Sequence, residues 1–239
     1  MAASAPPPGR RLYILSDAGK PIWTSTAEPE SVLAPLMGVI TAVLGFASSN
    51  RDALKAVTAG DTTTVVLVRG AVVLVAVSPY GETEVFLAAL LEQLYHQILF
   101  TLTSMVQKKL VASSSYDLRN LLGGTEGILA GLADRGLRDP GPLLLGAVRT
   151  LPLAPAVRDE CGRVLATARA QSGGSMLFAV LLAGDRLVTY LQPCLPEAHR
   201  LHPADLRLLV NFVAAQKALR GAESWTPLCL PRFNANGYL

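Results

Sequence analysis

Charged residues are scarce in this sequence. Asp, Glu, Lys and Arg make up 16% of its 239 residues, whereas about a quarter is usual for a soluble protein. The net charge is only +3, and the basic residues are scattered, with Arg10–Arg11 and Lys108–Lys109 as the only pairs of like basic residues. Because nucleic-acid binding needs a basic patch or stripe, this composition argues against a nucleic-acid partner. Weak attraction to a membrane surface stays open.

Cysteine and histidine are also rare. The three cysteines, Cys161, Cys194 and Cys229, are far apart and form no CxxC pair, which argues against both a disulfide framework and a structural zinc site. His199 and His202 have a spacing that metal ligands can have, but no third ligand stands near them. His202 is followed by proline, so it is better interpreted as the start of a helix. We expect three reduced thiols, no metal and no cofactor.

Catalytic motifs are absent as well. The sequence contains neither G-x-S-x-G nor H-E-x-x-H. Gly19–Lys20 resembles the end of a phosphate-binding loop, but Pro21 stands where such a loop needs Ser or Thr to bind magnesium. His96 is expected to be a half-buried polar residue of a helix, and Asp159–Glu160 a solvated helix face. We therefore expect no catalytic residue, and a protein that acts by binding other proteins.

Long uninterrupted apolar runs are lacking too. A spanning helix needs about 20 mostly apolar residues, but Thr64–Val77 is broken by Arg69 and Gly70, and Val85–Val106 carries polar residues near its middle. Residues 1–10 lack the apolar core of a signal peptide. Because 51% of the residues are apolar, we expect a cytoplasmic chain whose excess apolar surface is covered by a partner subunit.

The first half of the sequence predicts an antiparallel sheet with helices. Arg11–Ser16 and Pro21–Thr26 are typical of a hairpin around the turn at residues 17–20. Apolar residues recur at helical spacing over Val32–Phe46. Further strands are expected at Leu54–Thr58, Thr62–Val68 and Ala71–Ser78, followed by a helix from Glu82 to about Lys109 and another within Tyr116–Leu132. The fold class is α/β (α+β), with the first helix on one face of a five-stranded sheet.

The second half repeats the opening order. Residues 139–142, Asp-Pro-Gly-Pro, favour a boundary. A helix-rich stretch, Leu143–Ala170, precedes a hairpin of Met176–Ala183 and Arg186–Gln192, a helix from His202, a strand at Trp225–Leu230 and the start of another at Phe233–Leu239. We expect a disordered leader at 1–10, a first domain at 11–138, and a second domain at 139–239 that is incomplete at its C-terminus.

Several segments resemble the Mon family of vacuolar fusion proteins. Tyr13–Ile22 (YILSDAGKPI) is similar to the family's opening hairpin, and Met37-Gly38-Val39 to a Met-Gly-Val in its first helix. Tyr116–Leu122 is similar to its Tyr-Asp-Leu-Arg-Arg-Leu-Leu segment, with Asn120 in place of an arginine. Glu223–Asn234 (ESWTPLCLPRFN) is the most specific match. The resemblance covers nearly all of residues 11–239 in the family's order.

The resemblance implies tandem longin-like domains and a role in a heterodimeric guanine-nucleotide exchange factor. The partner would be a Ccz-type longin subunit, and the substrate a late-endosomal or vacuolar Rab GTPase. The protein would lie peripherally on late-endosomal and vacuolar (lysosomal) membranes, act in endosome maturation, vacuole fusion and autophagy, and contact endosomal lipids. Family members have a third longin domain and a long polar N-terminal region, so the resemblance also implies a truncated chain.

The function implied by the resemblance needs no acid or base, because exchange follows from differential affinity for the nucleotide-free GTPase. Two alternatives stay open: a longin scaffold of a trafficking complex that exchanges nothing, and a related paired-longin exchange subunit that serves lysosome-related organelles. The candidates for contact with the partner or the Rab lie in the hairpin and in the first helix: Lys20, Ile22, Trp23, Met37, Thr41 and Leu44. The competing interpretation is that Ile22, Met37 and Leu44 are ordinary core, whereas an aromatic such as Trp23 is typical of interface hot spots.

Overall fold

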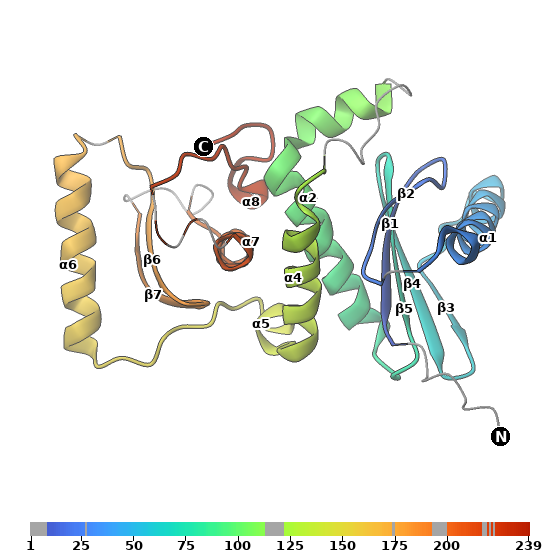
Figure 1. Ribbon diagram of the computed structural model, residues 1–239, viewed down its shortest axis with the longest axis horizontal. Helices are drawn as coiled ribbons and strands as arrows, with labels where there is room; N and C mark the ends of the chain where they lie inside the picture. Colours follow the sequence, from blue (N-terminus) through green and yellow to red (C-terminus); the bar gives the residue numbers. More distant parts are fainter. Residues whose placement is uncertain are drawn as a thin grey trace. The chain divides into compact units, whose positions relative to one another are not determined.

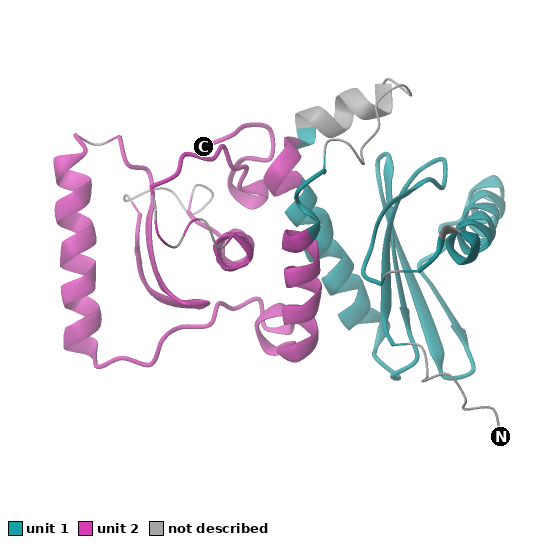
Figure 2. Cartoon of the chain, viewed as in Figure 1, with its two compact units in different colours: residues 1–98, 104–126 teal, residues 99–103, 127–239 magenta. Residues whose placement is uncertain are grey.

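The chain divides into two compact units. The computed structural model describes residues 9–26, 28–112, 122–173, 175–192, 200–216, 219, 221 and 223–239. Unit 1 consists of residues 1–98 and 104–126, and unit 2 of residues 99–103 and 127–239 (Figure 2). The domain boundary expected at residue 139 stays a prediction, and most of the expected leader at 1–10 lies outside the described residues.

Unit 1 contains a five-stranded antiparallel sheet, as expected for the fold class. Its strands are β1 (Arg11–Ser16), β2 (Pro21–Thr24), β3 (Ala56–Ala59), β4 (Thr62–Arg69) and β5 (Val72–Ser78). Their order is β2-β1-β5-β4-β3 (Figure 1). The hairpins β1–β2 and β4–β5 are confirmed. All of β1 pairs with β5, so the first and last strands of the unit meet at the centre of the sheet.

Helices cover both faces of this sheet (Figure 1). Helix α1 (Glu30–Ser49) packs on the face that carries Tyr13 and Leu15, and its residue Met37 belongs to the same core cluster. The first part of helix α2 (Glu84–Ala112) covers the opposite face, onto which the alternation of β1 directs Leu12 and Ile14. Because it lies between two helices, every residue of β5 is buried.

Unit 2 is built around a second hairpin. Strands β6 (Ala179–Ala183) and β7 (Arg186–Leu191) pair antiparallel as predicted. Helix α6 (Pro155–Gln171) lies on one side of this hairpin and α7 (Pro203–Ala215) on the other (Figure 1). The remaining helices of the unit are α4 (Glu126–Arg138), α5 (Gly141–Leu144) and α8 (Pro231–Asn234). The order of β6, β7 and α7 repeats that of β1, β2 and α1.

Polar contacts fix two helices of unit 2. The Arg158 side chain on α6 donates hydrogen bonds to the backbone carbonyls of Leu151, at 2.6 Å, and of Val188. The Asp205 carboxylate on α7 is fully buried and accepts hydrogen bonds from the backbone N–H groups of Arg232 and Phe233, at 3.0–3.1 Å. The first N–H groups of a helix lack acceptors within the helix, so Asp205 caps the start of α8, where the Phe233 N–H also donates to the Leu230 carbonyl at 3.0 Å.

The predicted strands near the C-terminus are wrong. Residues 225–230 have no regular secondary structure, and α8 occupies Phe233 and Asn234, where a further strand was expected to begin. Pro227 and Pro231 carry no N–H group and cannot donate to a ladder. Isolated backbone bonds hold the segment instead, from Cys229 N–H to the Phe100 carbonyl and from the last residue to the Leu228 carbonyl. The predicted helical segment at residues 116–121 lies outside the described residues.

Candidate functional site

The side of α1 that faces away from the sheet is apolar. No charged residue occurs between Ser31 and Asn50. The large apolar side chains that α1 exposes are Val32, Val39, Val43 and Phe46, with exposed fractions of 50%, 60%, 42% and 73%. These four residues are called the outer face of α1 below. An exposed apolar surface of this kind is typical of a site where another molecule binds.

Helix α1 is also one of two described helices that are long and apolar enough to cross a membrane, at Ser31–Ser49 and Glu84–Ser104. The second is 61% buried, as expected for a core helix, whereas only 11% of the first is buried. The expectation that no apolar run reaches the length of a membrane span was therefore wrong for α1. Gly38 and Gly45 interrupt the large apolar residues of this segment, but the segment as a whole is apolar. Length and composition alone do not distinguish a membrane span from a protein interface.

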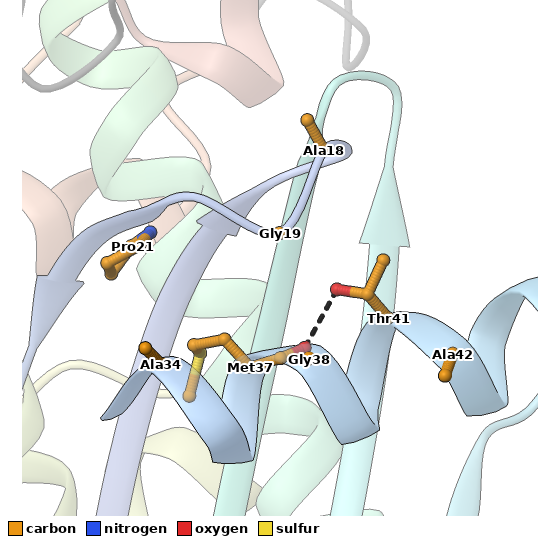
Figure 3. A pocket seen from close by; sticks show the side chains of 8 residues that line it. All are labelled: Ala18, Gly19, Pro21, Ala34, Met37, Gly38, Thr41 and Ala42. Carbon is orange, nitrogen blue, oxygen red and sulfur yellow. Dashed lines mark hydrogen bonds between the residues drawn. The ribbon is translucent and has the colours of Figure 1, made fainter. Parts of the chain in front are cut away.

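A pocket lies beside this helix, between α1 and the turn that joins β1 to β2 (Figure 3). Its volume is about 490 Å³. The turn contributes Ala18, Gly19 and Pro21 to its wall, and α1 contributes Ala34, Met37, Gly38, Thr41 and Ala42. None of these residues is charged. The Thr41 hydroxyl donates a hydrogen bond to the Met37 carbonyl at 2.8 Å, so its proton is already engaged within the helix.

The wall formed by the turn depends on a glycine. Gly19 has a φ of +79°, and a Cβ atom at this position would lie 2.4 Å from the Thr41 hydroxyl oxygen. The turn can therefore approach α1 only because residue 19 has no side chain. Backbone hydrogen bonds of 2.9 Å from Ser16 N–H to the Lys20 carbonyl, and from Gly19 N–H to the Ser16 carbonyl, fix its shape.

The structure separates the predicted interface residues into two groups. Met37, Trp23 and Ile22 are 2%, 7% and 8% exposed, and Leu44 packs partly buried against the core cluster of unit 1. For Ile22, Met37 and Leu44 this supports the core interpretation, and Trp23 is buried too, opposite Ile14 on the α2 side of the sheet. Lys20 is exposed and Thr41 lines the pocket. Their interface role stays a prediction.

The next residues to be placed are the histidines that the sequence offered as polar helix residues or metal ligands. His202 begins α7, and its Nδ1 accepts a hydrogen bond from Ala204 N–H at 3.1 Å, which confirms the predicted helix start. His96 is largely buried, with its Nε2 3.8 Å from a Glu92 carboxylate oxygen. In the part of the chain that the structure describes, no three His, Cys, Asp or Glu residues are grouped to hold a metal ion. His199 and Cys194 lie outside that part.

The two described cysteines are free, and they differ in their surroundings. Cys161 is partly exposed on α6, whereas Cys229 is fully buried. Burial, with a smaller contribution from the nearby Asp205 carboxylate, raises the pKa of the Cys229 thiol to about 11. Since the thiolate is the reactive form, Cys229 is a poor nucleophile at neutral pH.

Comparison with known proteins gives two family matches and a set of relatives. Residues 10–132 match the family described as the first longin domain of FUZ, MON1 and HPS1, and residues 174–239 the second longin domain of the same proteins. The chain is 41% identical over 232 residues to the vacuolar fusion protein MON1 homolog B of Mus musculus, and 37% identical over 230 residues both to MON1 homolog A of Gallus gallus and to Protein SAND of Takifugu rubripes.

These alignments cover 96% of this chain but only 41%, 40% and 43% of the three relatives, so the chain spans about two fifths of their length.

Proposed function

Because the chain belongs to the longin family of FUZ, MON1 and HPS1, we propose that it is a subunit of a vesicle-trafficking complex that acts in fusion at the vacuole and the late endosome. The names of its relatives support this role, since they include vacuolar fusion proteins. The complex would work at the surface of late-endosomal and vacuolar membranes, where such fusion takes place.

The finer proposal is a heterodimeric exchange factor. The chain pairs with a Ccz-type longin subunit, and the pair accelerates GDP release from a late-endosomal Rab GTPase. It does so by binding the nucleotide-free GTPase more tightly than the nucleotide-bound form. A thousandfold preference corresponds to about 4 kcal/mol, which a broad interface supplies without a catalytic acid, base or nucleophile.

One observation carries the proposed pairing: the outer face of α1 is apolar, uncharged and exposed within the first longin domain. The opposite side of the same helix is buried on the sheet, so packing on the sheet fixes the position of α1 and leaves its outer face exposed. Interface centres are depleted in charged residues and enriched in large apolar ones. A second longin subunit that covers this face would remove four large apolar side chains from water.

The test is co-expression of the full chain with a Ccz-type longin subunit. Light scattering on the purified sample should give the mass of one copy of each subunit. Release of a fluorescent GDP analogue from late-endosomal Rab GTPases should be fast with the pair and slow with either subunit alone. A pair that forms and leaves every tested Rab unchanged would favour the scaffold alternative. Activity confined to the Rabs of lysosome-related organelles would favour the related exchange subunit, and absence of a pair would refute the partner assignment.

A further inference from the structure

We infer that residues 228–239, called the strap below, hold helix α2 in a broken form, and that α2 becomes one continuous helix when the strap is released. Thr103 marks the break, with a φ of +59° and a ψ of 159° inside a helix that runs from Glu84 to Ala112. Residues 99–103 and the strap belong to the same compact unit, unit 2. Both states are internal to the chain, so the inference does not rest on the proposed function.

The local sequence of α2 favours an unbroken helix. Sharp kinks in helices usually occur at proline or glycine, and α2 contains neither. Leucine, alanine, glutamine and lysine, which are good helix formers, make up much of it. Thr103 is β-branched, and a β-branched residue with a positive φ is an outlier that its surroundings must hold in place. The break therefore has a cause outside α2 itself.

The strap supplies hydrogen-bond donors to the two backbone carbonyls just before the break. In a continuous helix the carbonyls of Phe100 and Thr101 accept from the N–H groups of residues 104 and 105. The angles of Thr103 turn the chain out of that pattern. In the structure the Cys229 N–H donates to the Phe100 carbonyl at 2.9 Å, and the Tyr238 hydroxyl donates to the Thr101 carbonyl at 3.1 Å. The strap thus satisfies the acceptors that the break leaves over.

Apolar packing and the buried Asp205 carboxylate hold the strap in place. Leu230 belongs to the same core cluster as Phe100, and the Arg232 and Phe233 N–H groups donate to Asp205. The strain at Thr103 opposes these contacts, and relief of strain of this kind shifts an equilibrium by about 5- to 150-fold. The balance between the broken and the continuous form of α2 therefore depends on which residue stands at position 103.

Labelling of the Cys229 thiol in the full chain measures release of the strap. The thiol is fully buried while the strap is in place, so its rate of reaction with a maleimide at fixed pH reports the population of the released form. Thr103→Gly adopts a positive φ without strain and weakens a continuous helix, whereas Thr103→Ala keeps the Cβ atom and favours that helix. We expect Cys229 to react at least about 10-fold more slowly in Thr103→Gly than in Thr103→Ala.

Three matched controls accompany this pair. Thr167 lies within the regular helix α6, where glycine weakens a helix relative to alanine, so Thr167→Gly should not react more slowly than Thr167→Ala. Tyr238→Phe removes the donor to the Thr101 carbonyl and should speed Cys229 labelling about 3-fold. Tyr190→Phe on β7, at a similar exposure of 42% against 49% for Tyr238, should leave the rate unchanged. The partly exposed Cys161 should keep its rate in every variant.

Three results would overturn the inference. Equal Cys229 rates in Thr103→Gly and Thr103→Ala would show that the break is not held against strain. An unchanged rate in Tyr238→Phe would show that the hydroxyl does not hold the strap on α2. A urea dependence of Cys229 labelling as steep as that of global unfolding would show that the strap leaves only when the chain unfolds, because a local opening exposes little surface.

Discussion

A single charge on the outer face of α1 should abolish pairing and leave the fold intact. Val39 is 60% exposed on α1, and Val164 is 61% exposed on α6. The substitutions Val39→Asp and Val164→Asp therefore introduce the same carboxylate, at the same exposure, into two helices. In the free chain both carboxylates face water, and surface substitutions of this kind change the free energy of unfolding by about 0.5 kcal/mol or less.

The two variants should differ strongly once the partner binds. Burying a whole valine side chain stabilises by about 1.5 kcal/mol or slightly more, and three fifths of Val39 remains to be buried, so its loss costs about 1 kcal/mol. A carboxylate enclosed without a partner costs about 3–5 kcal/mol more. The sum of at least about 4 kcal/mol corresponds to roughly a thousandfold loss of affinity for Val39→Asp. Val164→Asp should bind as tightly as the unmodified chain.

The measurement is titration calorimetry of each variant against a Ccz-type longin subunit, with circular dichroism to confirm the fold. Equal affinities for Val39→Asp and Val164→Asp would refute the reasoning. If both were unchanged, the outer face of α1 would not be the interface. If both were lost, the substitutions would act through folding or net charge and not through the covered face.

Three further predictions concern stability and reactivity. Trp23→Ala should lower the free energy of unfolding by about 3–5 kcal/mol in denaturant titrations, because Trp23 is only 7% exposed. Asp205→Ala removes the acceptor at the start of α8 and should cost about 1.5–3 kcal/mol. Burial also raises the pKa of the Asp205 carboxyl group. The folded chain therefore binds a proton at Asp205 more readily than the unfolded chain does, and this proton should stabilise the fold as the pH falls through the raised pKa. The Asp205→Ala variant should lack this gain in the free energy of unfolding. Since burial raises the pKa of Cys229 to about 11, site-resolved mass spectrometry near neutral pH should find maleimide labelling of Cys229 much slower than that of Cys161, and equal rates would contradict this burial.

The sheet of unit 1 could be predicted because local signals agree with the fold. β-branched residues fill Thr62–Val68 and Val72–Ser78, and Arg69–Gly70 between them fits a tight turn. The first hairpin has an equally local signal in Asp17 and Gly19. The central position of β5 could not be predicted in the same way, since its pairing with β1 joins residues about 60 apart in sequence, from Arg11 with Val77 to Ser16 with Val72.

The predicted interface residues were chosen without knowing which sides of the elements are covered. With helices on both faces of the sheet, neighbouring strand residues can both be buried, as Tyr13 and Ile14 are on β1 and Ile22 and Trp23 are on β2. Helix α1 is apolar all round, so its sequence lacks the contrast between a polar and an apolar side that marks an exposed face. For that reason neither the burial of Met37 nor the exposure of Phe46 follows from the sequence.

The C-terminal error has a different cause. Leu228, Cys229 and Leu230 are apolar and follow an aromatic residue, which is a pattern of strands. In the structure Cys229 and Leu230 are buried without a strand partner, because Leu230 belongs to the core cluster of unit 2 and its neighbour bonds to α2. Packing against helices thus replaces strand pairing, and the sequence pattern does not distinguish the two.

The apolar character of α1 follows from two protein surfaces and does not require a bilayer. The inner side of the helix, with Leu33 and Met37, covers six buried sheet residues of one core cluster: Tyr13, Leu15, Val66, Val73, Val75 and Val77. Moving α1 into a membrane would uncover those six side chains, at about 1.5 kcal/mol each. The total of about 9 kcal/mol is comparable with the whole stability of a domain. The inner side of α1 therefore stays packed on the sheet, and only the outer face is free to contact a partner protein. A charge on the inner side, as in Met37→Asp, should unfold unit 1, whereas Val39→Asp, two residues away on the outer face, should only prevent pairing.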